Sequence, residues 1–225
     1  MCPQGPVSVV IPVHNGQAVI GEALRSVFDQ TCRPREIIVI DDGSTDQTEA
    51  QVKTFAADVV FIRQPRQGAA AARNAGALRA TCRYLAFLDA DDLWPKARLE
   101  RQLVPLIENP ELDFVSGSMI QFKRGSSGAI VPLSAPEASR LPSVLLMRRE
   151  AFWKVGAFSS RWEVGETIEW WSRAVDAGLH GISLPDIALF RRIHDHNLGK
   201  TADAPTRAYL QMLHAVVSRR RESGG

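Results

Sequence analysis

Short apolar runs alternate along the first half of the chain with segments in which apolar residues recur every three or four positions. The runs are typical of strands buried on both faces, and the recurring pattern is typical of helices that pack one face on a sheet. Four strands are predicted at residues 7–11, 36–40, 58–62 and 84–88. Because a helical segment follows each strand, we expect an α/β fold with a single Rossmann-like, doubly wound sheet and helices on both faces.

Local signals place the helices between these strands. Apolar residues recur at helical spacing over residues 17–28, and small residues fill the segment 68–76, where they would permit close packing on the sheet. Ser44 followed three residues later by Gln47 is a capping-box pattern, which predicts a helix start. Pro95 predicts the first turn of another helix. Its inward face is expected to carry Leu99, Leu103, Leu106 and Ile107.

After residue 110 the alternation of strand and helix is lost. Apolar runs at 114–122 and 129–133 flank a glycine-rich turn, which predicts a hairpin and therefore antiparallel strands in a mixed sheet. Further predicted elements are a strand at 141–147, helices at 149–155 and 165–178, and an amphipathic helix at 205–221. Pro12, which follows the first apolar run, is expected to end that strand because proline cannot donate to a sheet ladder.

Composition indicates a soluble globular protein and no nucleic-acid partner. Of 225 residues, 45% are hydrophobic and 23% charged, and the net charge is only +2. We expect one domain at residues 1–200, with a ligand-binding half at 1–110 and a second half at 111–200. A helix and basic tail at 201–225 would follow, and this helix could pack on the body or join two copies into a homodimer.

The three cysteines form no C-x-x-C pair, so neither a zinc site nor a disulfide framework is indicated. No apolar run approaches the roughly 20 residues of a membrane helix, and residues 1–6 lack a signal-peptide core. We therefore expect a cytoplasmic protein, for which peripheral contact with a membrane stays open.

Carboxylates follow two of the predicted strands. Asp41 and Asp42 come after the second strand, and Asp89, Asp91 and Asp92 come after the fourth. Parallel strands bring such residues to one rim of the sheet, where α/β proteins bind ligands. Crowded carboxylates repel one another, and Mg²⁺ or Mn²⁺ would offset their charge. A solvated acidic turn explains the second cluster equally well when it is considered alone.

Other polar residues could complete a site. Arg73, in the small-residue helix, could clamp a phosphate or pair with a carboxylate of the 41–46 turn. Glu166 and Glu169 lie near the start of the helix at 165–178, where acidic residues also complement the helix dipole. Arg191, Arg192 and His194 cluster after an apolar run, and His194 is a candidate metal or diphosphate ligand.

Four motifs together resemble the inverting family 2 glycosyltransferases of the GT-A fold. They are residues 9–15 (VVIPVHN), 40–46 (IDDGSTD), 68–76 with Ala72-Arg73-Asn74, and 87–92 (FLDADD). The resemblance covers the first half strongly. The second half is looser, with residues 165–173 similar to the acceptor-side acidic motif and 191–194 similar to an Arg-x-x-His loop.

The resemblance implies a role for each motif residue. Implied contacts to the nucleotide or its diphosphate are Pro12, His14, Asn15, Asp41 or Asp42, Arg73, Asp89 and Ala90. Asp91, with Asp89 and His194, would hold Mn²⁺ or Mg²⁺, and Arg191 and Arg192 would lie near the diphosphate. The implied reaction moves a sugar from a nucleotide donor, with UDP favoured, to an unidentified acceptor.

Thr167 departs from the family pattern, which usually has Glu-Asp before the arginine of this helix. A threonine hydroxyl cannot act as a general base near neutral pH, so the base would be Glu169, which we prefer, or Glu166. A dehydrogenase is disfavoured because no G-x-G-x-x-G follows the first strand, and a haloacid-type phosphatase or a pyrophosphorylase would need different loops there. A nucleotide-sugar-binding subunit with weak or no catalysis stays open.

Overall fold

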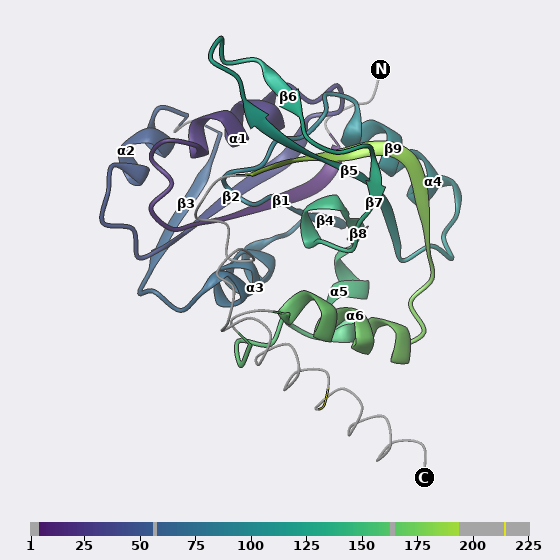
Figure 1. Cartoon of the computed structure of the whole chain (residues 1–225). Helices are drawn as coiled ribbons and strands as arrows, with labels where there is room; N and C mark the ends of the chain where they lie inside the picture. Colours follow the sequence, from purple (N-terminus) through teal and green to yellow (C-terminus); the bar gives the residue numbers. More distant parts are fainter. Residues whose placement is uncertain (1–4, 56–57, 163–164, 194–213, 215–225) are drawn as a thin grey trace.

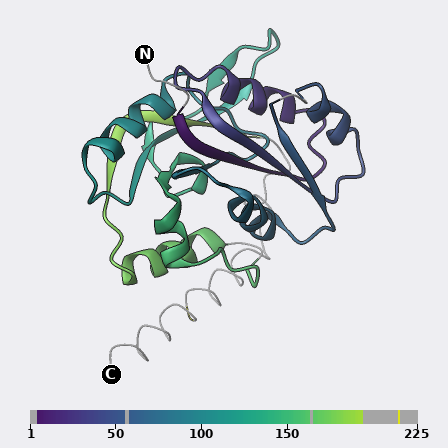
Figure 2. The ribbon, with the colours of Figure 1, turned by 180° about the vertical axis from the view of Figure 1, so that it is seen from behind.

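The computed structural model describes residues 5–55, 58–162, 165–193 and 214 of the chain. In this part of the chain, nine strands form one sheet in the order β3-β2-β1-β4-β8-β5-β6, and β7 and β9 also pair with β5. Figure 1 shows the sheet with helices above and below it, and Figure 2 shows the same layers from behind. The predicted mixed, mainly parallel sheet with helices on both faces is confirmed.

The first half of the chain forms the parallel part of the sheet. Its strands are β1 (Gly5–Val13), β2 (Pro34–Asp42), β3 (Val60–Gln64) and β4 (Tyr84–Phe87). β1 is parallel to both β2 and β4, and β2 is parallel to β3. β1, β2 and β4 are buried along most of their length, as their continuous apolar runs predict, whereas β3, at the edge of the sheet, is only partly buried.

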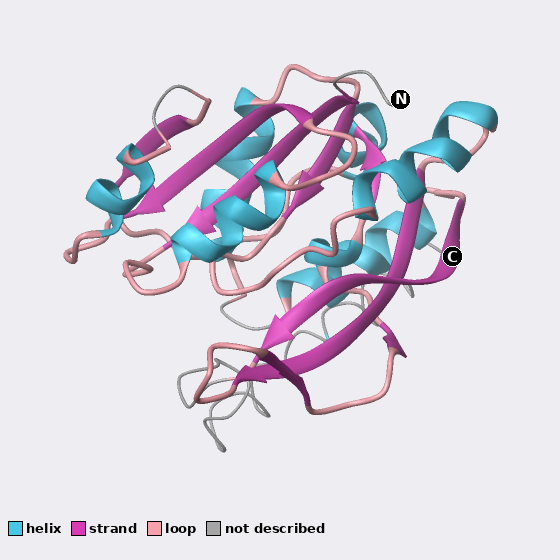
Figure 3. Ribbon diagram, turned by 90° about the horizontal axis from the view of Figure 1, so that it is seen from above, coloured by secondary structure: helices cyan, strands magenta, loops and turns pink. Residues whose placement is uncertain are grey.

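The second half adds antiparallel strands and one long parallel strand. These are β5 (Phe114–Arg124), β6 (Ile130–Pro132), β7 (Glu137–Ala138), β8 (Leu146–Arg148) and β9 (Gly181–Arg192). β8 is antiparallel to β4 and β5, and β6 completes the predicted hairpin with β5. β9 runs parallel to β5, and Figure 3 shows the two long strands side by side.

Helices cover both faces of the sheet. They are α1 (Ile20–Phe28), α2 (Thr48–Lys53), α3 (Ala69–Arg79), α4 (Arg98–Glu108), α5 (Arg149–Val155) and α6 (Glu166–Asp176). In Figure 1, α1, α2 and α4 lie above the sheet and α3, α5 and α6 lie below it. One hydrophobic cluster runs from β1 to α6 and β9, so both halves of the chain share a core.

Close packing of α3 on β1 explains the small residues of that helix. A Cβ atom at Gly76 would lie 2.2 Å from Cγ1 of Val10. No real Cβ contact is that short, so the helix can approach the strand at this distance only with glycine at position 76. The expectation of close packing in this segment is confirmed.

Two proline positions differ from the expectation. Pro12 does not end the first strand, because β1 continues to Val13 and Pro12 pairs with Ile40 in a parallel register. α4 begins at Arg98, and Pro95 precedes it and accepts a hydrogen bond from the Arg98 N–H through its carbonyl. On this helix Ile107 is 59% exposed, so its predicted inward orientation is wrong.

The predicted strand at 141–147 is shorter in the structure. A single turn of 3-10 helix, η1 (Pro142–Val144), comes first, and β8 begins at Leu146. Pro142 lacks an N–H group and starts the turn, which leaves Leu146–Arg148 for the ladder. The helices predicted at 149–155 and 165–178 are present as α5 and α6.

The amphipathic segment at 205–221, and with it the expected homodimer contact, lies outside the described residues except for His214. Within the described residues, no helix has the length and apolar character needed to cross a lipid bilayer. Cys82 is a buried free thiol, whereas Cys32 is disulfide-bonded, which departs from the expectation for the cysteines.

Candidate active site at the strand ends

The carboxyl ends of β1, β2 and β4 meet at one rim of the sheet. Val13, the last residue of β1, pairs with Asp41 in β2, and Asp89 follows two residues after β4. Both carboxylate clusters predicted from the sequence therefore lie at the same edge, at the ends of β2 and β4, with β1 between them. This edge is where open α/β sheets bind their ligands.

Asp41 carries a carboxylate oxygen without a hydrogen bond. Its Oδ1 accepts the Ser44 N–H at 3.0 Å, while Oδ2 is buried and has no hydrogen-bond partner among the described residues. Arg63 Nε lies 3.6 Å from Oδ2, too far for a hydrogen bond. Asp41 lines an open cleft of about 280 Å³, together with Ser44, Asp46 and Arg63. A ligand N–H group could satisfy the remaining oxygen.

The Asp42 side chain is fully used in holding the turn between β3 and α3. Its carboxylate accepts hydrogen bonds from the Gln64 amide at 2.8 Å, the Gln67 N–H at 2.8 Å and the Gly68 N–H at 2.7 Å. These bonds fix the turn between β3 and α3. Of the two aspartates left open by the sequence, Asp41 is thus the one with unused hydrogen-bonding capacity.

His14 and Asn15 hold the loop after β1 against the loop after β2. His14 Nδ1 lies 2.9 Å from the Asp42 carbonyl oxygen. The Asn15 N–H donates to Ser44 Oγ at 2.8 Å, and Asn15 Oδ1 accepts the Thr45 N–H at 2.8 Å. Asn15 has φ of +51°, a conformation that asparagine tolerates better than most residues. These contacts position the rim of the cleft.

Ser44 does not cap α2, which begins four residues later at Thr48. The N-cap residue is Gln47, without a side-chain capping bond, and the Asp46 carboxylate satisfies the first helical N–H, that of Thr48, at 3.0 Å. Ser44 instead receives the N–H of Asn15, which places this serine in the contact between the two loops. The prediction of Ser44 as the capping residue is therefore wrong, although the helix does begin within four residues of it.

Arg73 lies between two carboxylates from distant parts of the chain. Its Nη2 donates to Asp89 Oδ1 at 2.7 Å, and its Nη1 donates to Glu166 Oε1 at 3.1 Å. Burial alone would lower the pKa of this guanidinium, but the charges of Asp89 and Glu166 outweigh it and raise the pKa. Arg73 does pair with carboxylates, but its partners are Asp89 and Glu166, so the expected pairing with the 41–46 turn is wrong.

The loop after β4 is held in place by the end of β9. The Leu93 N–H donates to the Phe190 carbonyl at 3.0 Å, and the Phe190 N–H donates to the Leu93 carbonyl at 2.9 Å. Asp92 Oδ1 accepts the Arg192 N–H at 2.8 Å. Burial, together with the charges of Asp91 and Asp89, raises the pKa of Asp92 well above its usual range. Three carboxyl groups therefore crowd this loop, and the buried one, Asp92, favours its neutral form.

Arg192 braces the same loop, and Glu22 holds Arg192. Arg192 Nε donates to the Asp91 carbonyl at 2.7 Å, and its Nη2 donates to Glu22 Oε2 at 3.1 Å. Glu22 also pairs with Arg124. The sequence offered no signal for Glu22, because an acidic residue in the first turn of a helix is ordinarily explained by the helix dipole.

Glu169 is engaged away from the carboxylate loop. Its carboxylate forms a two-point ion pair with Arg173, in which Nε lies 2.9 Å from Oε1 and Nη2 lies 2.9 Å from Oε2. Arg173 also donates to the carbonyls of Val155 and Ala157, at 2.7 Å each. This network ties α6 to the end of α5. The geometry therefore favours Glu166 over Glu169 as the glutamate that faces the site.

The acidic loop suits a divalent cation that shares its ligands with a substrate. Among the described residues, no three His, Cys, Asp or Glu side chains gather closely enough to hold a metal ion by themselves. Mg²⁺ is usually bound by one or two carboxylates together with substrate phosphates, and Asp89 and Asp91 match that arrangement. The repulsion of Asp92 by Asp91 and Asp89 agrees with it, because a cation would offset that repulsion. His194, the third expected ligand, lies outside the described residues.

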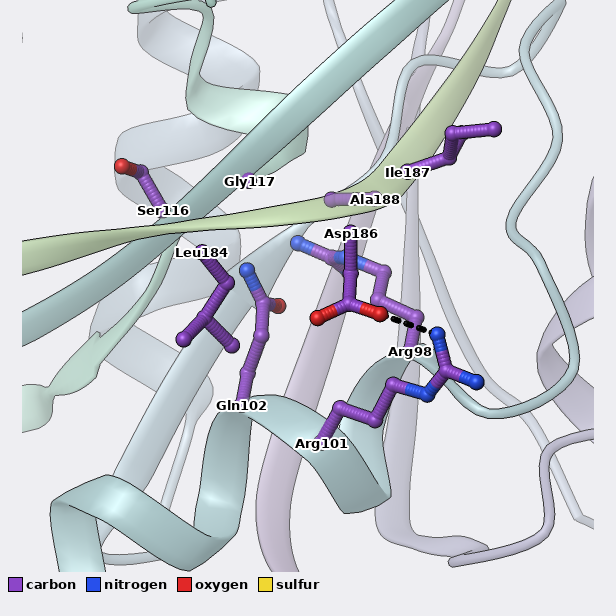
Figure 4. Close-up of a pocket in the computed structure, with 9 residues that line it drawn as sticks. All are labelled: Arg98, Arg101, Gln102, Ser116, Gly117, Leu184, Asp186, Ile187 and Ala188. Carbon is purple, nitrogen blue, oxygen red and sulfur yellow. Dashed lines mark hydrogen bonds and ion pairs between the residues drawn. The ribbon is translucent and has the colours of Figure 1, made fainter.

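A second pocket lies between α4 and the strands β5 and β9 (Figure 4). Buried Arg98 and Gln102 line it, and Asp186 at its mouth pairs with Arg101. Arg98 Nε and Nη1 and Gln102 Oε1 have no hydrogen-bond partner among the described atoms. The free volume of about 10 Å³ admits one water molecule. None of the residues predicted for the site lines this pocket.

A parallel sheet with carboxylates at the ends of β2 and β4, on either side of β1, is typical of a ligand-binding α/β protein. The sequence model described as Glycosyl transferase family 2 matches residues 8–152, well over half of the chain. EpsE of Bacillus subtilis, whose name assigns it provisionally to the glycosyltransferases, is 30% identical over 212 residues, which cover 87% of this chain and 76% of EpsE. The chain belongs to glycosyltransferase family 2.

Other relatives match the first half of the chain. The Escherichia coli protein named UDP-Glc:alpha-D-GlcNAc-diphosphoundecaprenol beta-1,3-glucosyltransferase WfgD is 34% identical over 114 residues, or 50% of this chain and 45% of WfgD. An uncharacterized glycosyltransferase of Rickettsia conorii is 42% identical over 105 residues, or 46% of this chain and 17% of that protein. The chain thus spans less than half the length of these curated relatives.

Solved structures share the fold. TarS 1–349 of S. aureus in complex with UDP-GlcNAc superimposes with a TM-score of 0.74 at 21% identity, over 93% of this chain and 65% of that one. The mannosyltransferase PcManGT of Pyrobaculum calidifontis, in complex with GDP-Man and Mn²⁺, has a TM-score of 0.69 at 20% identity, over 96% and 64% of the two chains. These likenesses confirm the GT-A fold.

Proposed function

We propose that this chain is a metal-dependent, inverting glycosyltransferase that moves a sugar from a UDP-linked donor to a nucleophilic acceptor. The observation that carries the proposal is the cluster of Asp41, Arg73, Asp89, Asp91 and Glu166 at one rim of a family 2 fold. UDP is favoured because TarS was solved with UDP and with UDP-GlcNAc, and because WfgD is named for UDP-Glc. GDP is the second choice, since PcManGT was solved with GDP-Man.

The nucleoside would be recognised beside β2. The buried Oδ2 of Asp41 can accept an N–H group, such as the one on a uracil ring, in the cleft that this residue lines. Pro12, His14 and Asn15 shape the neighbouring loop, and Ala90 would lie at the start of the acidic turn. Arg191 stays a candidate for contact with the diphosphate, whereas the side chain of Arg192 braces the loop.

The reaction would be a single displacement at the anomeric carbon. A divalent cation held by Asp91 and Asp89 would neutralise charge on the leaving diphosphate. Glu166 would take the proton of the acceptor hydroxyl as its oxygen forms a bond to the anomeric carbon. The bond from that carbon to the diphosphate oxygen would break on the opposite side, which inverts the configuration.

A catalytically weak nucleotide-sugar-binding subunit is the second candidate. Two observations favour it: Thr167 replaces the usual aspartate, and the Glu166 carboxylate already bonds to Arg73. Replacement of Glu166 separates the two candidates, because a binding subunit would lose no turnover.

Calorimetric titration with UDP, GDP and dTDP, each with and without Mn²⁺, tests the donor site. We expect metal-dependent micromolar binding of UDP, and a loss of at least about tenfold in D41N, where an amide N–H would face the ligand N–H. D186N is the matched control, because Asp186 lies in the pocket of Figure 4 and pairs with Arg101. If no nucleotide binds to the folded protein, the donor site proposed here is wrong.

A further inference from the structure

Arg73 joins two parts of the site that belong to different halves of the chain. Asp89 is 16 residues away along the sequence and Glu166 is 93 residues away. The arginine side chain is only 7% exposed, and Asp89 and Glu166 are 29% and 16% exposed. Water screens such a buried triad weakly, so the three charges affect one another strongly.

The guanidinium and a cation would compete for the same carboxylate. Arg73 Nη2 donates to Asp89 Oδ1 at 2.7 Å, and Asp89 is also one of the two carboxylates suited to a divalent ion. A metal ion on Asp89 repels the nearby guanidinium. Glu166 offsets this repulsion, because it offers the guanidinium a second carboxylate at 3.1 Å. A rigid two-pronged side chain is needed to bond to both partners at once.

We propose that Arg73 is a positioning residue that makes cation binding at Asp89 and the placement of Glu166 mutually dependent. This inference rests on the proposed function and adds a connection between its donor and acceptor sides. When a donor with its cation engages Asp89, Arg73 bonds more strongly to Glu166 and fixes this glutamate at the acceptor side. Because such coupling is reciprocal, Glu166 in turn favours binding of the cation and donor.

A double-mutant cycle tests the coupling, with the affinity for Mn²⁺ plus UDP as the readout. We expect E166Q to weaken this affinity about tenfold in the wild-type background, because Arg73 then bonds to Asp89 alone and opposes the cation. In the R73Q background, the same E166Q change should weaken it by no more than about twofold. E169Q is the matched control, because it makes the same charge change one turn along α6, on a carboxylate bonded to Arg173.

If R73Q is not properly folded, as a lack of cooperative unfolding would show, R73K replaces it in the cycle. Lysine keeps the charge but cannot bond to both carboxylates with a planar fork, so the effect of E166Q should fall below about threefold. An equal effect of E166Q in the wild-type and the Arg73-variant backgrounds would overturn the inference and leave the donor site intact. Absence of any binding of Mn²⁺ plus UDP by the wild-type protein would instead contradict the proposed function itself.

Discussion

Glu166 and Glu169 stand one turn apart on α6, but their carboxylates serve different partners. Glu166 bonds to Arg73 beside the acidic loop, whereas Glu169 bonds to Arg173 and is 9% exposed. A general base must reach the acceptor proton within hydrogen-bond distance, so geometry decides between the two. We therefore propose Glu166, the residue nearer the carboxylate loop, as the base.

We therefore predict that E166Q lowers kcat for donor turnover by about 10²-fold to 10⁴-fold, the usual contribution of a general base. The rate should be measured as UDP release at saturating Mn²⁺ and UDP-sugar, so that weaker binding does not enter the result. Unchanged kcat in E166Q would eliminate Glu166 as the base and favour the binding-subunit alternative.

E169Q should behave in the opposite way. Turnover at saturation should stay within a few-fold of wild type, and the protein should lose about 1–3 kcal/mol of unfolding free energy because Arg173 loses its charged partner. Urea unfolding and UDP release on the same preparation separate the two effects. A loss of turnover as large as that of E166Q, at unchanged stability, would restore Glu169 as the candidate base.

Local sequence patterns located the acidic loop and Arg73 but could not assign their partners. Asp89 and Asp91 are recognisable because they directly follow a buried strand. The Arg73 contact to Glu166 spans 93 residues, and the Glu22 contact to Arg192 spans 170, so no local pattern encodes either. The roles of the individual site residues stay predictions until binding and turnover are measured.

At the scale of elements, the contact of α3 with β1 at Gly76 leaves no room for a larger side chain. A Cβ at Gly76 would lie 2.2 Å from Val10, whereas a Cβ at Gly21 in α1 would lie 3.5 Å from the flexible Arg25 side chain. We predict that G76A costs about 1–3 kcal/mol of unfolding free energy through overpacking. G21A, the matched control, should be neutral or stabilise by about 0.5–1 kcal/mol.

Thermal and urea unfolding of the two variants check this prediction. Equal unfolding midpoints for G76A and G21A would mean that α3 can move away from β1 without loss of unfolding free energy. The same close packing sets the position of Arg73 in the middle of α3, so a shifted helix should also weaken UDP binding in G76A.

Elements with continuous apolar patterns were predictable, and irregular ones were not. β1, β2 and β4 are buried along their length and their apolar runs indicate strands. The first half of β9 is largely exposed, and its pairing with β5 shifts register between Ser116 and Met119. This first half has neither an apolar run nor a regular alternation, so only the apolar run at the end of the strand was noticed in the sequence.

For the molecule as a whole, Glu22 links three separate elements. It lies on α1 and bonds to Arg192 at the end of β9 and to Arg124 at the end of β5. Burial alone would raise the pKa of Glu22, but the bonds to the two arginines outweigh it and lower the pKa below 4.5. Stability from this carboxylate is therefore present above pH 4.5 and is lost as the pH falls through the lowered pKa.

We predict that E22Q is about 1 kcal/mol less stable than wild type at pH 7, since the group is partly exposed. The difference should shrink progressively below pH 4.5, where the wild-type carboxylate becomes protonated. Urea unfolding of both proteins between pH 3 and 7 measures it. A difference that stays constant over this range would show that Glu22 contributes by packing and not by charge.

The order of the strands in the sheet could not be deduced from the sequence alone. The alternation of strands and helices indicates a parallel sheet, but the placement of β8 between β4 and β5 depends on contacts between distant segments. That placement matters for the site, because Ser143, in the turn before β8, accepts the Asp89 N–H at 3.3 Å. The described residues of both halves share one core, while the domain limits at residues 110 and 200 stay predictions.

The most direct test of metal-dependent, inverting transfer is the fate of the donor. UDP-sugars would be incubated with the wild-type protein and with D91N, with and without Mn²⁺, while NMR follows the anomeric proton and UDP release. We expect release of UDP only with Mn²⁺, a loss of at least about tenfold in D91N, and a β-configured product from an α-linked donor. Equal release by D91N, release without metal, or a product that retains the α configuration would contradict the proposed mechanism.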